Sequence, residues 1–154
     1  MNISLNSTIK PSIFETNSIF LNASDISLIE YSAFFGSIQI FQYLILNNVE
    51  LKSSTWLYAI HSGNGEIIHL LESNEVLPPD NKYENLLIES IKCHHNNIAE
   101  YIENNLLPTN YNEINNTKIL KKILKYHNYL RLPMDISGNE DFYYLFKLLC
   151  LLFY

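Results

Sequence analysis

The chain has 154 residues, with 10 Lys or Arg against 16 Asp or Glu, so its formal net charge is −6. This length is enough for one domain that buries its apolar core without disulfides or metals. Binding to nucleic acid is disfavoured, because proteins that grip phosphates collect Lys and Arg on one face.

The two cysteines, Cys93 and Cys150, stand far apart and lack the dense spacing of a secreted disulfide scaffold. We expect both to be free thiols in a reducing compartment. Polar residues interrupt the first twenty positions, and Lys10 and Pro11 fall where a signal peptide would be apolar. The sequence therefore predicts a cytoplasmic protein.

Residues 1–26 are expected to form an N-terminal cap segment. The apolar run SIFETNSIFL after Pro11 predicts a capping helix. Asp25 or Ser24 is the expected N-cap of the following helix, because short polar side chains accept hydrogen bonds from its first N–H groups.

Three segments then align without gaps, and they define internal repeats at residues 27–53, 54–84 and 85–109. An anchor residue fixes the register of each repeat: Gly36, Gly63 or His94. Before the anchor, a large apolar residue stands at minus seven, a small one at minus four and a further apolar one at minus three. These positions hold Ile29, Trp56 and Leu87, then Ser32, Ala59 and Ser90, then Ala33, Ile60 and Ile91.

After the anchor, the repeats share apolar residues at plus four, seven, eight and thirteen, and Asn at plus eleven. In the order of the repeats these are Ile40, Ile67 and Ile98; Tyr43-Leu44, Leu70-Leu71 and Tyr101-Ile102; Val49, Val76 and Leu107; and Asn47, Asn74 and Asn105. We expect each set to occupy equivalent environments, above all the three isoleucines at plus four.

This spacing predicts an all-α fold of short helix pairs. Apolar residues at minus seven, four and three lie on one face of a helix, as do those at plus four, seven and eight. The chain must reverse between the two helices, which needs a position that tolerates positive φ, and Gly36 and Gly63 supply it. Asn at plus eleven marks a left-handed helix end.

At these residues the chain resembles the ankyrin-repeat family. The stretch GNGEIIHLL, from Gly63 to Leu71, is similar to the family's G-x-x-E-I-V-x-L-L signature, and Ala59 falls on the first of its paired alanines. The resemblance implies an ankyrin-like solenoid of stacked helical hairpins that acts as a non-catalytic protein-interaction module. It covers residues 27–107.

Two departures from the family pattern are clear. The family's T-P-L-H opening would fall on Ser54, Thr55, Trp56 and Leu57, so the Pro and the His are missing. The anchors are 27 and 31 residues apart, whereas the usual ankyrin period is about 33. The chain is therefore most similar to diverged ankyrin-like domains found beside ordinary repeats.

Residues 110–154 are predicted to form C-terminal helices. The first is a linker helix, and the rest belongs to an incomplete further repeat. Ile119, Leu120, Ile123 and Leu124 make one apolar helix face, and Pro133 blocks its continuation. The apolar segment 142–154 is too short for a transmembrane span, which needs about 20 residues. We expect it to pack as a helix through Phe142, Leu145 and Phe146, and an uncapped end there predicts self-association.

No cofactor, metal or catalytic site is expected. Cys93, His94 and His95 are consecutive, so their side chains diverge, and the paired spacing of a structural zinc site is absent. His61 and His69 have no Cys or carboxylate at a fixed spacing. The GNGEIIHL stretch also lacks the Lys-Ser/Thr of a phosphate-binding loop. A metal-dependent enzyme that uses Cys93 to His95 is the remote alternative.

The expected binding surface lies on the first helix of each repeat, at minus five and minus two, off the predicted core face. An exposed aromatic strip there would bind a partner protein. The six candidate partner-binding residues are Tyr31, Phe34, Tyr58, His61, Glu89 and Lys92. In the alternative interpretation, Tyr31 and Phe34 pack against the N-terminal cap. A truncated family member without an independent function is the other alternative to an interaction module.

Overall fold

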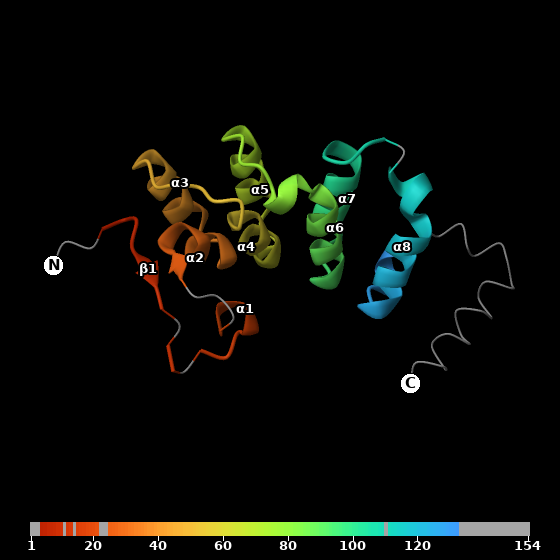
Figure 1. Cartoon of the computed structure of the whole chain (residues 1–154), viewed down its shortest axis with the longest axis horizontal. Coiled ribbons are helices and arrows are strands. Elements are labelled where there is room, and N and C mark those ends of the chain that lie inside the picture. The colour runs from red at the N-terminus through yellow and green to blue at the C-terminus, as the bar shows by residue number, and fades with distance from the viewer. Residues whose placement is uncertain (1–3, 11, 14, 22–24, 110, 133–154) are drawn as a thin grey trace, which may run out of the picture.

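A computed structural model shows α-helical hairpins that pack next to one another in a row, in the order of the sequence (Figure 1). The structure describes every residue except 1–3, 11, 14, 22–24, 110 and 133–154. The elements are β1 Thr8–Ile9, α1 Ser18–Leu21, β2 Ile26–Ser27, α2 Leu28–Phe34, α3 Ile38–Leu46, α4 Thr55–Ser62, α5 Gly65–Ser73, η1 Pro79–Asn81, α6 Tyr83–Lys92, α7 Asn96–Asn105, α8 Tyr111–Lys125 and η2 Tyr129–Arg131. The all-α prediction is confirmed, because the described strands are only the antiparallel pair β1 and β2.

Each predicted repeat contains one helical hairpin: α2 with α3, α4 with α5, and α6 with α7. The first helices pack side by side in chain order, so that α4 lies between α2 and α6, and α8 follows α6 (Figure 1). The second helix α3 packs on α5. The first helices therefore form a continuous layer.

The predicted turn geometry is confirmed at all three anchors. Gly36, Gly63 and His94 have φ values of 64°, 69° and 61°. Two of the positions hold glycine because the left-handed region is costly for residues with a Cβ. Gly63 also has a packing reason, since a Cβ there would lie 2.7 Å from Cε1 of His95.

The predicted core of the first helices is likewise confirmed. All nine residues at minus seven, minus four and minus three are buried. The small residues Ser32 and Ser90 direct their hydroxyls back to the helix, where they donate to the carbonyls of Ile29 and Leu87 at 2.8 and 2.7 Å. Small residues at this position permit close packing between neighbouring first helices.

The three isoleucines at plus four are not equivalent, which corrects the prediction. Ile67 and Ile98 are 0% and 3% exposed, whereas Ile40 is 56% exposed and Tyr43, one turn later, is also 56% exposed. The reason is position: α3 belongs to the first hairpin, and no described hairpin precedes it. The equivalent buried positions are plus five and plus eight, occupied by Phe41, Ile68 and Ala99, then Leu44, Leu71 and Ile102.

The recurring Asn at plus eleven ends each second helix by a mechanism other than the predicted left-handed backbone. Asn47 and Asn74 both have φ of −93°, and the left-handed residues are the next ones, Asn48 and Glu75. The Asn side-chain amide instead donates to the carbonyl four residues earlier. Its distance is 2.8 Å at Asn47, 2.7 Å at Asn74 and 2.9 Å at Asn105. The Tyr43 and Leu70 carbonyls also accept the backbone N–H of the same Asn, so the side chain adds a second donor at the end of the helix.

The N-terminal segment differs from the prediction in its helix and its cap. The helix α1 is a single turn. Ser27, rather than Asp25 or Ser24, caps α2, where Ser27 and Glu30 form a capping box. Glu30 is 3% exposed and also accepts from the Ser54 hydroxyl, so this cap joins the first two hairpins.

The helix α8 ends in a fourth turn of the same kind. His127 has φ of 55°, like the three anchors. The N–H groups of His127 and Asn128 donate to the carbonyls of Leu124 and Ile123, at the same offsets as in the turn at His94. Because α8 also packs on α6, as α6 packs on α4, it occupies the place of a fourth first helix in the row.

The predicted apolar face of α8 is confirmed, since Ile119 and Ile123 are buried and Leu120 and Leu124 are half-buried. The segment 142–154, which includes Phe142, Leu145 and Phe146, lies outside the described residues, so its packing and its role in self-association stay predictions. Among the helices that the structure describes, none has the length and apolarity needed to cross a bilayer.

Candidate functional site

The six predicted partner-binding residues divide into an aromatic part and a polar part. In the aromatic part, the ring of Phe20 covers the strip. Its centroid lies 5.0 Å from that of Tyr31, 4.5 Å from that of Phe34 and 6.2 Å from that of Tyr58. The alternative that Tyr31 and Phe34 pack against the N-terminal segment is thus confirmed. Tyr58 is only 8% exposed, so the expectation of an exposed ring is wrong there.

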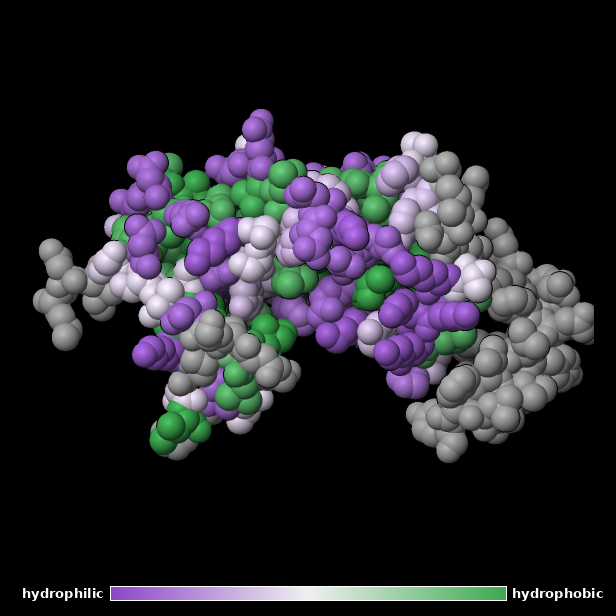
Figure 2. Space-filling model, in the orientation of Figure 1, coloured by the Kyte–Doolittle hydropathy of each residue, from purple (hydrophilic) through white to green (hydrophobic). Residues whose placement is uncertain are grey.

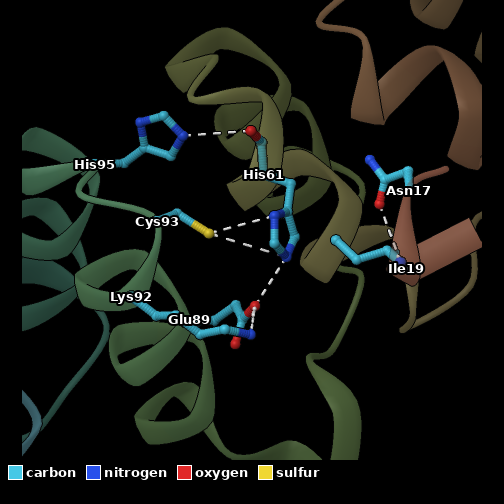
Figure 3. Close-up of polar contacts among 7 residues, drawn as sticks. All are labelled: Asn17, Ile19, His61, Glu89, Lys92, Cys93 and His95. Atoms are coloured by element: carbon cyan, nitrogen blue, oxygen red, sulfur yellow. Dashed lines mark hydrogen bonds and ion pairs between the residues drawn. The ribbon is translucent and has the colours of Figure 1, made fainter. Parts of the chain in front are cut away.

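The polar part brings His61, Glu89 and Lys92 together. His61 lies near the end of α4, and both other residues lie on α6, which packs against α4. Nε2 of His61 is 2.8 Å from Oε1 of Glu89, and Nζ of Lys92 is 2.9 Å from the same oxygen (Figure 3). Side-chain exposure is 17% for His61 and 20% for Glu89, so this pair is largely sheltered from water.

Cys93 completes this cluster. Its Sγ lies 3.3 Å from Nδ1 and 3.9 Å from Nε2 of His61 (Figure 3). Glu89 lies on α6 and Cys93 is the C-cap residue of that helix, four residues later and with helical backbone angles, so both side chains lie on one side of it. Sequence reasoning assigned His61 no Cys or carboxylate partner, and this was wrong, because both partners come from the next hairpin.

The other two residues of the Cys93 to His95 run point elsewhere, as predicted. Nε2 of His94 lies 2.9 Å from the carbonyl oxygen of Tyr126. The ring of His95 lies over Gly63, with its Nε2 3.3 Å from the carbonyl oxygen of His61. These three consecutive side chains therefore do not converge on one point.

The cluster is strongly polarised. Burial by itself lowers the pKa of His61, but hydrogen bonds with Cys93 and Glu89 outweigh it and raise that pKa to about 9. The hydrogen bond with His61 lowers the pKa of Glu89 to about 2, against the opposing effect of burial. Near neutral pH, His61 and Glu89 thus form an imidazolium–carboxylate pair.

The order Cys93, His61, Glu89 places a thiol beside a base that a carboxylate orients, as in nucleophilic enzymes. The neighbouring backbone does not complete such a site. The N–H groups of His94, His95 and Asn96 each donate to a backbone carbonyl, so they are not free to stabilise an oxyanion. These three N–H groups therefore do not form an oxyanion hole beside Cys93.

Some of the exposed apolar residues lie on α3 and form a second candidate surface, which we call the α3 face. It consists of Ile40, Tyr43 and Leu46. Their exposed fractions are between 56% and 81%. Figure 2 shows hydrophobic atoms in green among polar ones at this end of the molecule. Sequence reasoning placed Ile40 and Tyr43 in the core, so it missed this surface.

Comparisons with models of protein families, with curated proteins and with solved structures found no match to this chain. The resemblance to ankyrin repeats stays a prediction that depends on the motif and on the repeat spacing.

Proposed function

We propose that the chain is a diverged ankyrin-like solenoid that acts as a non-catalytic protein-interaction module. Three helical hairpins with left-handed anchors at equivalent offsets, packed first helix against first helix, support this architecture. The family's function is binding between proteins, and the free Cys93 thiol suits a cytoplasmic location.

The observation that carries the proposal is the exposed α3 face. Ile40 is 56% exposed, while its repeat counterparts Ile67 and Ile98 are buried. An apolar side chain that is buried in two repeats and exposed in another indicates a surface that binds a partner protein. Tyr43 adds aromatic contact area at a low cost in conformational entropy.

The partner is expected to present an apolar helix. Within the chain, α3 already packs against α5, so helix-on-helix contact is how this layer buries its apolar residues. The residues Ile40 and Tyr43 are three apart, and so are Tyr43 and Leu46, a spacing that a facing helix can follow along one stripe.

The test is affinity purification of the chain from its native cell, followed by mass spectrometry and by titration of the purified partner. We expect a protein that is retained by the wild type and lost by the double variant Ile40→Glu, Leu46→Glu. Leu130→Glu is the matched control, because Leu130 is 89% exposed and lies at the opposite end of the row. Equal affinity of the purified partner for the wild type and the double variant would contradict the proposal.

The alternative is a truncated family member without an independent role. A fragment with an incomplete stack should unfold with weak cooperativity, since each repeat depends on its neighbours. Thermal unfolding of the isolated chain, followed by circular dichroism, distinguishes the two: a single sharp transition supports the interaction module.

A further inference from the structure

The cluster of His61, Glu89 and Cys93 combines three donor types on two neighbouring hairpins. One ligand atom from each residue can be chosen so that all lie within 4.8 Å of one another. Imidazole, thiolate and carboxylate are the protein ligands that zinc accepts, and three of them with an open fourth position are typical of a solvent-accessible zinc site. From this convergence we propose that His61, Glu89 and Cys93 bind a divalent cation of the zinc class, with water as the fourth ligand.

Two of the three ligand separations are close to those around a four-coordinate ion, and the ligand atoms of the cluster all lie within 4.8 Å of one another. Bonds of about 2.0 to 2.3 Å in tetrahedral geometry place neighbouring ligand atoms about 3.5 Å apart. Nε2 of His61 lies 2.8 Å from Oε1 of Glu89 and 3.9 Å from Sγ of Cys93. Shifts of about half an ångström in these two separations would admit the ion beside Nε2.

The donors are held by ordered structure rather than by loops. Glu89 lies on α6, Cys93 is the C-cap residue of that helix, and His61 lies on α4, which packs against α6. His95 contacts the His61 carbonyl and packs over Gly63, which fixes the end of α4. Such outer contacts orient metal ligands in many sites. The ion would therefore join the second and third hairpins.

Lys92 already contacts the cluster, through Oε1 of Glu89. Its side chain is 47% exposed and long, so it can turn into solvent when the ion binds. All three donors are half-buried, so water can reach the fourth position. Binding also requires loss of the proton between His61 and Glu89 and of the thiol proton.

The test uses the full chain, freed of metal by chelation, with Co²⁺ as a spectroscopic probe and Zn²⁺ as its competitor. Cys150→Ser is the background, so that Cys93 is the only thiol. We expect a near-ultraviolet thiolate-to-cobalt band that Zn²⁺ abolishes, together with a rise in the unfolding temperature. Cys93→Ser should remove the band, and His61→Gln or Glu89→Gln should weaken Co²⁺ binding at least tenfold.

His69→Gln is the matched control, because His69 is an exposed histidine on α5 outside the cluster. It should leave the cobalt spectrum and affinity unchanged, and circular dichroism should show native helix content in every variant compared. The proposal is overturned if the Cys150→Ser background shows no thiolate-to-cobalt band, or if His61→Gln and Glu89→Gln bind Co²⁺ as well as it does. Rapid alkylation of Cys93 without Co²⁺ binding would instead show a reactive thiol–imidazole pair.

Discussion

The side-chain amide of Asn64 donates a 3.2 Å hydrogen bond to the carbonyl of Gly36, and so joins the turns of the first two hairpins. The amide oxygen of the same residue accepts the N–H of Glu66 at 3.0 Å and caps α5. Asn128 has the equivalent place in the turn after α8, and its amide donates to the carbonyl of Ile91 at 2.9 Å. Hydrogen bonds from these turn residues to the preceding hairpin thus accompany helix packing along the row.

Asn64→Ala is predicted to lower the free energy of unfolding by about 1–2 kcal/mol. The substitution removes the cap of α5 and leaves the Gly36 carbonyl without this donor. Urea denaturation followed by circular dichroism measures the change. Asn85→Ala is the control, because Asn85 is exposed on α6; its effect should be close to zero, and equal losses in both variants would contradict the assigned role.

Gly63→Ala is predicted to destabilise the protein by about 1–3 kcal/mol, whereas Gly65→Ala should be neutral or stabilising. Gly63 combines a φ of 69° with a Cβ position 2.7 Å from the His95 ring. Gly65 begins α5 and has nothing within 4 Å of its Cβ position, so Ala there only restricts the unfolded chain. Chemical denaturation of the two variants checks the pair, and a tolerated Gly63→Ala would show that the turn relaxes freely.

Ile67→Ala and Ile40→Ala test the different environments of the plus-four residues. Ile67 is fully buried, so its truncation should cost about 2–4 kcal/mol through lost burial and a residual cavity. Ile40 is mostly exposed, so the same change should cost less than about 0.5 kcal/mol. If both variants lose stability equally in urea denaturation, Ile40 is covered in solution, for instance in a self-associated form.

The hairpins could be predicted from the sequence because their signals are local. A positive-φ turn, flanking apolar periodicity and a recurring Asn are all found within one repeat of the chain. The exposure of Ile40 could not be predicted this way, since aligned repeats are treated alike and only position in the row distinguishes the first. The place of α8 in the row could not be predicted either. Counted from His127, Ile123 stands at minus four, where the other repeats have a small residue.

The His61, Glu89 and Cys93 cluster was missed for a related reason. His61 is 28 residues from Glu89 and 32 from Cys93, and they meet only because α4 packs on α6. A signal was present: the three residues stand at minus two, minus five and minus one, positions on adjacent first helices. Placing the aligned repeats side by side, rather than searching each for spaced ligands, would have revealed it.

Glu103 of α7 forms an ion pair with Arg131 of η2, and both side chains are only 12% exposed. The Arg131 guanidinium also donates to the carbonyl of Asn96 at 3.1 Å, so this pair fastens the segment after α8 to the third hairpin.

Glu103→Ala is predicted to lower the free energy of unfolding by about 2–4 kcal/mol, because it leaves a largely buried guanidinium without its counter-charge. Glu100→Ala, which removes an exposed carboxylate from α7, should cost less than about 0.5 kcal/mol. Guanidinium chloride would screen the ion pair, so the two variants are compared in urea. Equal stability of both variants would show that Arg131 finds compensation in solvent and that the ion pair does not hold the fourth turn.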